Sequence, residues 1–142
     1  MNETKLEIGD YYVLLNLHKA LLEAKFHMNP DNILVCSSPI IADLSNEIVD
    51  ILIKLDEIKD KNNKEKWENW RRLKNQEFYK ERAVKNALLN DRWLKLDDEG
   101  KVKCTKNLLS PFKATEDEIK TFITEVNEVF CVAEEIVGND TK

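Results

Sequence analysis

Glycine, proline and cysteine are all scarce in this chain of 142 residues, which contains three of each. So few turn-forming residues argue against a β architecture, which needs many tight turns, and favour long helices. The cysteines Cys36, Cys104 and Cys131 are odd in number and form no Cys-x-x-Cys pair. This pattern predicts neither a disulfide framework nor a zinc site, and it favours a reducing compartment, which we take to be the cytoplasm.

Long apolar runs are missing as well. Charged residues interrupt the most apolar stretch at Asp43, Glu47, Asp50 and Lys54, and no basic patch followed by an apolar segment opens the chain. We therefore expect neither a membrane-spanning helix nor a secretion signal. The chain also lacks a glycine-rich phosphate loop and a Gly-x-Ser-x-Gly nucleophile motif. These absences favour a protein without catalytic activity and without a cofactor.

Helical periodicity, by contrast, is abundant. In two stretches apolar residues recur with alternating steps of three and four: Ile41, Leu44, Ile48, Ile51, Leu55 and Ile58 in one, and Ile119, Phe122, Val126, Val129, Ala133 and Ile136 in the other. Each pattern predicts an amphipathic helix that must bury one face. Because these faces need partners, the sequence predicts a mostly α-helical bundle in a single domain, residues 1–142, and a homo-oligomer would extend the burial.

Four principal helices are predicted, and they span residues of about 8–27, 38–60, 67–88 and 116–137. Ser38 can cap the second helix, and Thr115 with Glu118 forms a capping box before the fourth, for which Gly138 is the expected stop. The third helix is the least regular, with an expected break near Asn75. Together these signals predict where each helix of the bundle begins and ends.

One small β-hairpin is predicted near residues 93–105. Leu94 and Leu96 alternate with charged residues, and so do Val102 and Cys104 further along. The segment 98–100 between them, Asp-Glu-Gly, has the composition of a tight turn. A second short apolar run, 33–36, is expected to form a strand or a buried connector.

Charge is distributed unevenly along the chain. The formal net charge of −5 divides into −5 for residues 1–56, +5 for residues 57–95 and −5 for residues 96–142. Opposite patches attract each other, so an acidic body with a basic middle segment can also pair head to tail with a second copy.

Basic and aromatic side chains alternate in the middle segment, and such residues dominate many protein interfaces. The candidate partner-binding residues are Trp67, Trp70, Arg71, Arg72, Lys74, Phe78, Tyr79 and Arg82. Our first hypothesis is therefore a non-catalytic protein-interaction module, a small regulator, inhibitor or adaptor that binds another protein or itself. Its lysine-, asparagine- and isoleucine-rich composition suits an accessory protein of a phage or another mobile element. Tryptophans near a helix start are, however, also common core anchors.

The same segment supports nucleic-acid binding as the alternative, since basic side chains neutralise phosphates and aromatic rings stack on bases. The candidate residues within 64–103 are Lys64, Lys66, Arg71, Arg72, Lys95, Lys101 and Lys103. A helix followed by a hairpin is also the design of winged-helix DNA-binding proteins. Interspersed glutamates and a pI of 5.2 argue against this alternative.

A magnesium site is the third and least favoured hypothesis. Asp43, Glu47 and Asp50 share one helix face, with the Glu-x-x-Asp spacing that all-α nucleotide pyrophosphohydrolases use for magnesium. The second acidic pair of such a site is missing, because the first helix offers Glu23 with His27 instead. The three carboxylates also lie opposite the predicted apolar seam, so we expect them to face solvent.

Overall fold

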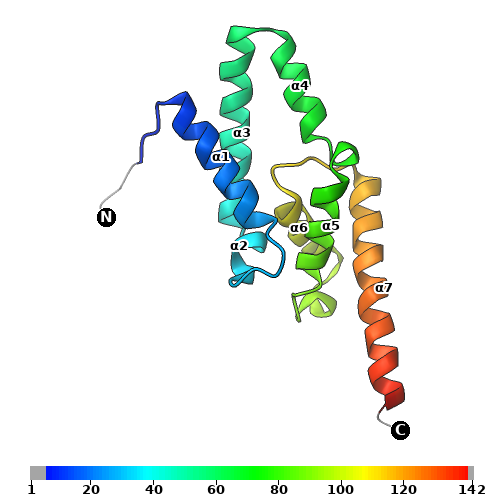
Figure 1. Cartoon of the computed structure of the whole chain (residues 1–142). Helices are drawn as coiled ribbons and strands as arrows, with labels where there is room; N and C mark the ends of the chain where they lie inside the picture. The colour runs from blue at the N-terminus through cyan, green and yellow to red at the C-terminus, as the bar shows by residue number, and fades with distance from the viewer. Residues whose placement is uncertain (1–5, 141–142) are drawn as a thin grey trace.

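The computed structural model describes residues 6–140, and the side chains up to residue 134. This part of the chain is all-α, as the sequence predicts, and it contains no strand (Figure 1). Its helices are α1 (Tyr11–Lys25), α2 (Ile33–Ser37), α3 (Pro39–Lys59), α4 (Asn62–Arg71), α5 (Glu77–Ala87), α6 (Asp98–Leu109) and α7 (Glu116–Asp140), with 3-10 turns η1 (Leu73–Asn75) and η2 (Trp93–Lys95). With seven helices, the prediction of about four is wrong. None of them is both long and apolar enough to cross a membrane.

The predicted hairpin is wrong, because residues 93–105 form η2 and most of α6. The side chain of Asp97 accepts a hydrogen bond of 2.7 Å from the backbone N–H of Gly100, which is the helix-capping geometry. Gly100 therefore lies in the first turn of a helix and not in a hairpin turn. Thr105, Leu108 and Leu109 are buried at helical spacing further along α6, and the four-residue alternation before them was too short to specify a strand.

The connector between α1 and α3 is the helix α2, so the alternative of a strand at residues 33–36 is wrong, and of the buried connector expected there only Cys36 is buried. After α1 the backbone turns at Asn29, which has a φ of 56°. This is a left-handed conformation that asparagine tolerates better than most residues. The side chain of Asn32 then caps α2 by accepting a hydrogen bond of 3.0 Å from the backbone of Leu34.

Helix α3 buries a different face from the one predicted. Of the expected seam only Ile48 is buried, whereas Leu44, Ile51 and Ile58 are exposed. The buried face is centred on Ala42, Ser45, Val49, Leu52 and Asp56, so it is rotated by one residue position. Small residues at the start of this face let α3 approach its neighbours closely, and the large apolar residues beside them stay at the surface.

The predicted starts of the second and fourth helices are confirmed, whereas the first helix begins at Tyr11 and the third at Asn62. Ser38 Oγ accepts a hydrogen bond of 3.2 Å at the start of α3, and Thr115 and Glu118 exchange reciprocal bonds of 3.1 and 2.9 Å at the start of α7. The predicted break near Asn75 corresponds to η1, which separates α4 from α5. Gly138 does not end α7, however, because the helix continues past it.

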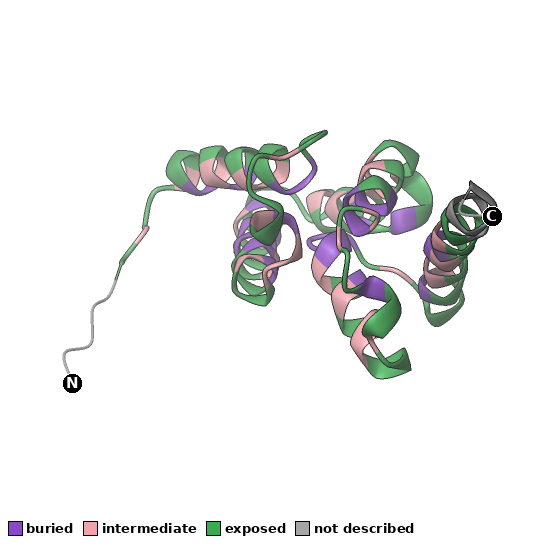
Figure 2. Ribbon diagram, turned by 90° about the horizontal axis from the view of Figure 1, so that it is seen from below, coloured by how far each residue is buried: buried purple, intermediate pink, exposed green. Residues whose placement is uncertain are grey.

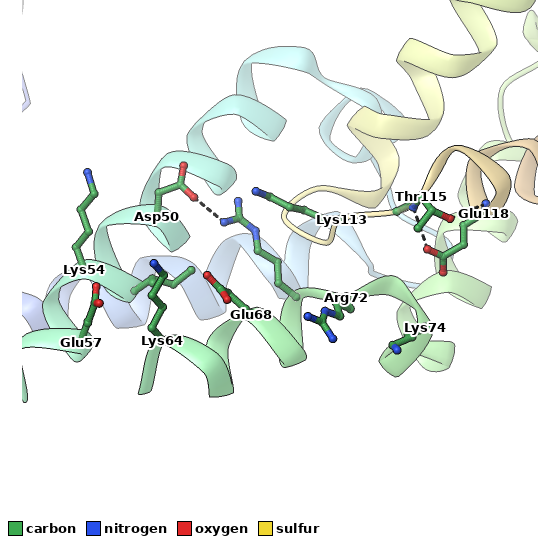
Figure 3. A pocket seen from close by; sticks show the side chains of 13 residues that line it. Asp50, Lys54, Glu57, Lys64, Glu68, Arg72, Lys74, Lys113, Thr115 and Glu118 are labelled. Atoms are coloured by element: carbon green, nitrogen blue, oxygen red, sulfur yellow. Dashed lines mark hydrogen bonds and ion pairs between the residues drawn. The ribbon is translucent and has the colours of Figure 1, made fainter. Parts of the chain in front are cut away.

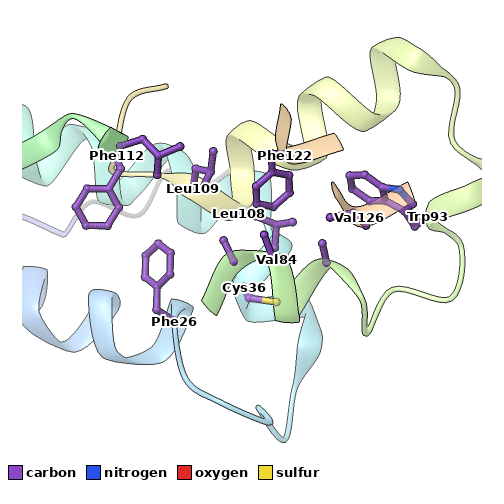
Figure 4. Packing of buried hydrophobic residues seen from close by; sticks show 12 residues of the cluster. Phe26, Cys36, Val84, Trp93, Leu108, Leu109, Phe112, Phe122 and Val126 are labelled. Atoms are coloured by element: carbon purple, nitrogen blue, oxygen red, sulfur yellow. The ribbon is translucent and has the colours of Figure 1, made fainter. Parts of the chain in front are cut away.

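Two clusters of buried apolar side chains hold the helices together. The larger cluster joins α5, α6 and α7 and includes residues from the ends of α1 and α2 (Figure 4): Phe26, Cys36, Leu73, Ala83, Val84, Ala87, Trp93, Leu108, Leu109, Phe112, Phe122 and Val126. The smaller cluster joins α1 to α3 through Leu14, Ile48 and Leu52. Figure 2 shows the buried residues as stripes on the inward faces of the helices.

Arg71, the last residue of α4, joins this helix to α3 and to the loop before α7. It is 4% exposed, and its Nε donates a hydrogen bond of 2.7 Å to the carbonyl of Pro111. Its Nη1 and Nη2 bind the side chains of Asp50 at 2.5 Å and Asn46 at 3.1 Å. The backbone N–H of Lys113 also donates to the carbonyl of Arg71 at 2.8 Å. These contacts fix the end of α4 against both α3 and the chain that leads into α7.

Candidate functional site

A groove runs along α1 and separates this helix from α4 and α5. Two hollows of about 480 and 310 Å³ form it, and they adjoin each other at Lys19 and Leu22, which line both. We call it the α1 groove; its walls are Leu15, His18, Lys19, Leu22, Glu23, Phe26 and His27 on one side, and Asn63, Lys66, Trp67, Trp70, Phe78, Tyr79 and Arg82 on the other.

Aromatic rings form much of the inner surface of the α1 groove. The ring of His18 packs edge-on against Trp67 and Trp70, with centroid distances of 5.7 and 5.3 Å, and the two indoles lie 5.4 Å apart. Further along, Tyr79 packs against Phe26 at 5.1 Å. Both tryptophans are half-buried, so each contributes to the packing of α4 on α1 while presenting part of its ring to the groove.

His18 is the unusual polar group of this surface. It is 6% exposed, and its Nδ1 has no hydrogen-bond partner among the described residues. Burial lowers the pKa of His18, and the nearby charge of Lys19 lowers it further, so the imidazole is neutral at pH 7. A buried nitrogen without a partner costs about 1–3 kcal/mol. The unpaired Nδ1 therefore lies buried beneath the wall of the groove.

The rim of the α1 groove is basic. Lys19, Lys66 and Arg82 line it, against the single carboxylate of Glu23. The guanidinium of Arg82 lies 4.8 Å from the ring centroid of Phe78, a side chain that is 59% exposed. This cation–π contact holds an aromatic ring and a positive charge together at one end of the groove.

The structure brings five of the eight candidate partner-binding residues to this one groove: Trp67, Trp70, Phe78, Tyr79 and Arg82. Arg71 does not belong with them, because it is buried and its guanidinium is bound by Asp50, Asn46 and Pro111. Its role is structural. Arg72 and Lys74 lie at a different hollow, described next.

A second hollow of about 810 Å³ lies between α3, α4 and the start of α7, and we call it the α4 cleft (Figure 3). Its lining is highly charged and mixed in sign. The basic residues are Lys54, Lys64, Arg71, Arg72, Lys74 and Lys113, and the acidic residues are Asp50, Glu57, Glu68 and Glu118. The net positive charge of the residues that line the α4 cleft is therefore small.

The candidate nucleic-acid residues do not form one surface. Lys64, Arg71 and Arg72 line the α4 cleft, whereas Lys66 lines the α1 groove. The remaining three, Lys95, Lys101 and Lys103, belong to η2 and α6, and Lys103 lies 3.6 Å from Glu99 in an ion pair one helical turn away. The hairpin that was expected to present them is absent from the described structure.

The candidate metal ligands Asp43, Glu47 and Asp50 are all exposed on α3. Asp50 is held by the guanidinium of Arg71. In the part of the chain that the structure describes, no three His, Cys, Asp or Glu side chains come close enough together to bind a metal ion. The geometry therefore offers no support for a magnesium site.

Sequence reasoning missed the α1 wall of the groove. Leu15, His18 and Leu22 lie on one face of α1 at steps of three and four, which is the signal that could have identified it.

Comparison with known proteins gives no relative from which a function could be transferred. No protein-family model matches the chain, and neither a curated protein nor a solved structure matches it. The functional inference depends on the geometry of the chain itself.

Proposed function

We propose that this chain is a non-catalytic protein-interaction module, a small regulator, inhibitor or adaptor that binds an acidic, amphipathic helical segment of a partner in the α1 groove. The observation that carries the proposal is the α1 groove, two adjoining hollows with an aromatic inner surface and a basic rim. The proposal also places the protein in the cytoplasm. The three unpaired cysteines of the chain, Cys36, Cys104 and Cys131, fit this location.

The shape of the groove supports a helix as the bound segment. Its walls follow α1 from Leu15 to Phe26, a distance of about 17 Å, which a helix of roughly three turns would span. Peptide helices bind such grooves by inserting apolar side chains at steps of three and four. Trp67, Trp70 and Tyr79 would receive these side chains, since large aromatic residues commonly carry most of the binding energy.

Charge supports an acidic partner. Lys19, Lys66 and Arg82 would face carboxylates on the polar edge of the bound helix, which favours rapid and selective association. Because this rim is exposed to solvent, we expect the association rate to fall as the salt concentration rises.

Peptide display on the full-length chain tests this proposal. We expect selected peptides to combine Leu, Ile or Phe at helical spacing with Asp or Glu. They should lose binding to a chain carrying Lys66→Glu and Arg82→Glu. Lys103→Glu is the matched control, because it reverses an exposed charge on α6, outside the groove. Selection of no peptide, or equal binding to the wild type and the double variant, would contradict the proposal.

Nucleic-acid binding is the second candidate, and the gathering of Lys64, Arg72, Lys74 and Lys113 at the α4 cleft is the observation that favours it. The test is the affinity for short single- and double-stranded oligonucleotides over a range of salt concentrations. Binding that weakens steeply with salt, and that is lost on replacing Arg72 and Lys74 by alanine, would support it. Binding that is insensitive to salt or to these replacements would exclude it.

A further inference from the structure

Helix α7 has two halves with different surroundings. In the first half Phe122 and Val126 belong to the larger cluster (Figure 4), and Ile119 is buried as well. The second half of α7 continues past α5 and α6 (Figure 1), and Phe130 is the last of its residues that packs against the larger cluster. There Val129 is 45% exposed and Val132 is 53% exposed. We call residues 129–140 the α7 tail.

The α7 tail has the chemistry of a groove-binding helix. Val129 and Val132 are three residues apart, and the sequence continues the spacing with Ile136. The tail contains three Asp or Glu and no Lys or Arg. Glu128 lies one turn from Val132, so acidic and apolar side chains share adjacent positions on the exposed surface of this helix.

The α7 tail therefore matches the α1 groove in three respects. Its exposed apolar side chains suit the aromatic surface of Trp67, Trp70 and Tyr79. Its carboxylates suit the basic rim of Lys19, Lys66 and Arg82. Its length also fits, since residues 129–140 rise by about 17 Å, as the groove does along α1.

The α7 tail cannot occupy the groove of its own chain. The indole Nε1 of Trp93 donates a hydrogen bond of 2.8 Å to Asn127, and Phe130 packs against the larger cluster, so α7 is attached to the body up to the first turn of the tail. α7 lies on the side of the molecule away from α1, as both views of the chain show (Figures 1 and 2). Only another molecule can deliver an α7 tail to the groove.

We propose that the α1 groove binds the α7 tail of a second copy of this chain. This inference rests on the function proposed above, because it names the occupant of the same groove. The contact joins two different surfaces, so it closes into a dimer when each copy donates its tail to the other. The carboxylates of one copy then neutralise the basic rim of its partner.

Sedimentation of the full-length chain over a wide concentration range tests the proposal. We expect the wild type to dimerise, and we expect Val132→Glu in the tail, or Lys66→Glu with Arg82→Glu in the groove, to weaken dimerisation by at least about tenfold. Val132 is exposed, so its replacement leaves the core intact, and circular dichroism checks that each variant is folded. Lys103→Glu is the control and should dimerise like the wild type.

Mixing the two defective chains provides the decisive measurement. The Val132→Glu chain keeps an intact groove, and the Lys66→Glu, Arg82→Glu chain keeps an intact tail. Native mass spectrometry should therefore detect a one-to-one heterodimer that neither chain forms with itself.

Three results would overturn the inference: a wild type that stays monomeric, a groove variant that dimerises normally, or a mixture without heterodimer. The second would indicate that tails pair with each other. In each case peptides selected by display would still report separately on the proposed function.

Discussion

Lys25 is fully buried, and its nearest partners are carbonyl oxygens. Its Nζ donates a hydrogen bond of 2.7 Å to Asn107 and one of 3.4 Å to Cys36, near the carboxyl ends of α6 and α2. Helix ends of this kind favour a positive charge, because their carbonyl groups lack partners within the helix. Burial acts in the opposite direction and lowers the pKa of Lys25 to about 8.

We expect Lys25 to make stability rise with pH between about 8 and 10.5. In this window the unfolded chain still holds the proton that the folded chain has released, so the free energy of unfolding increases by about 3 kcal/mol. Urea unfolding of the wild type and of Lys25→Met, compared at each pH, isolates this effect. Burial raises the pKa of Cys36 and of Cys104 in both proteins, so their opposing effect largely cancels. A difference that does not change with pH would contradict the prediction.

Arg71 and Arg72 are neighbours with opposite environments. Replacing Arg71 by alanine should lower the free energy of unfolding by about 3–5 kcal/mol, since it leaves the carbonyl of Pro111 and the side chain of Asn46 without their donor. Arg72 is exposed, so Arg72→Ala should cost less than about 0.5 kcal/mol. Denaturant unfolding of both variants checks this, and similar losses would show that Arg71 is not the structural residue described here.

At the scale of the helices, the sequence predicts the capped starts of α3 and α7 better than it predicts which face of a helix is buried. The caps at Ser38 and Thr115 need only neighbouring residues, so they can be inferred locally. The buried face of α3 depends on which side its neighbours approach, and this contact places Ser45 and Asp56 inside and Ile58 outside. Asp56 is stabilised there by the indole Nε1 of Trp67, which donates to it at 2.7 Å. No periodicity in α3 alone contains that information.

The candidate site shows the same limit. Trp67, Trp70 and Tyr79 could be selected from the sequence as interface residues because of their chemistry. The spacing of Leu15, His18 and Leu22 marks a face of α1, but the sequence does not show that this face lies opposite α4, because residues of α1 and α4 become neighbours only through tertiary packing. Arg71 illustrates the converse error, since an arginine in a basic segment has the composition of a binding residue while its contacts make it structural.

Asp97 caps the start of α6, the helix formed by residues 98–109. Asp97→Ala should lower the stability of the protein by about 1 kcal/mol, because the backbone N–H of Gly100 loses its acceptor. Asp98→Ala is the matched control: it removes a carboxylate from the same turn without removing that bond, and it should cost less. Thermal unfolding followed by circular dichroism compares the two. An equal effect of both variants would indicate that charge at the start of α6 matters and that capping by Asp97 does not.

Across the whole molecule, the two clusters differ greatly in size. The cluster of α5, α6 and α7 has twelve buried members and the cluster of α1 and α3 has three. Fewer buried apolar contacts mean a smaller free energy for opening that part of the molecule. The helix α3 should therefore open while α6 stays folded, and the α4 wall of the groove, which Trp67 joins to α3, should open with it.

Native-state hydrogen exchange measures this difference. We expect α3 amides to exchange through openings of lower free energy than those of α6. Leu108→Ala, in the larger cluster, should lower the protection of α6 by about 2–5 kcal/mol while leaving α3 unchanged, because α3 opens without disturbing Leu108. Leu52→Ala, in the smaller cluster, should lower the protection of both helices, since it destabilises the native state relative to both open forms. If Leu108→Ala lowered the protection of α3 as much as that of α6, the two clusters would form a single cooperative unit, and the α1 groove would open only when the whole chain unfolds.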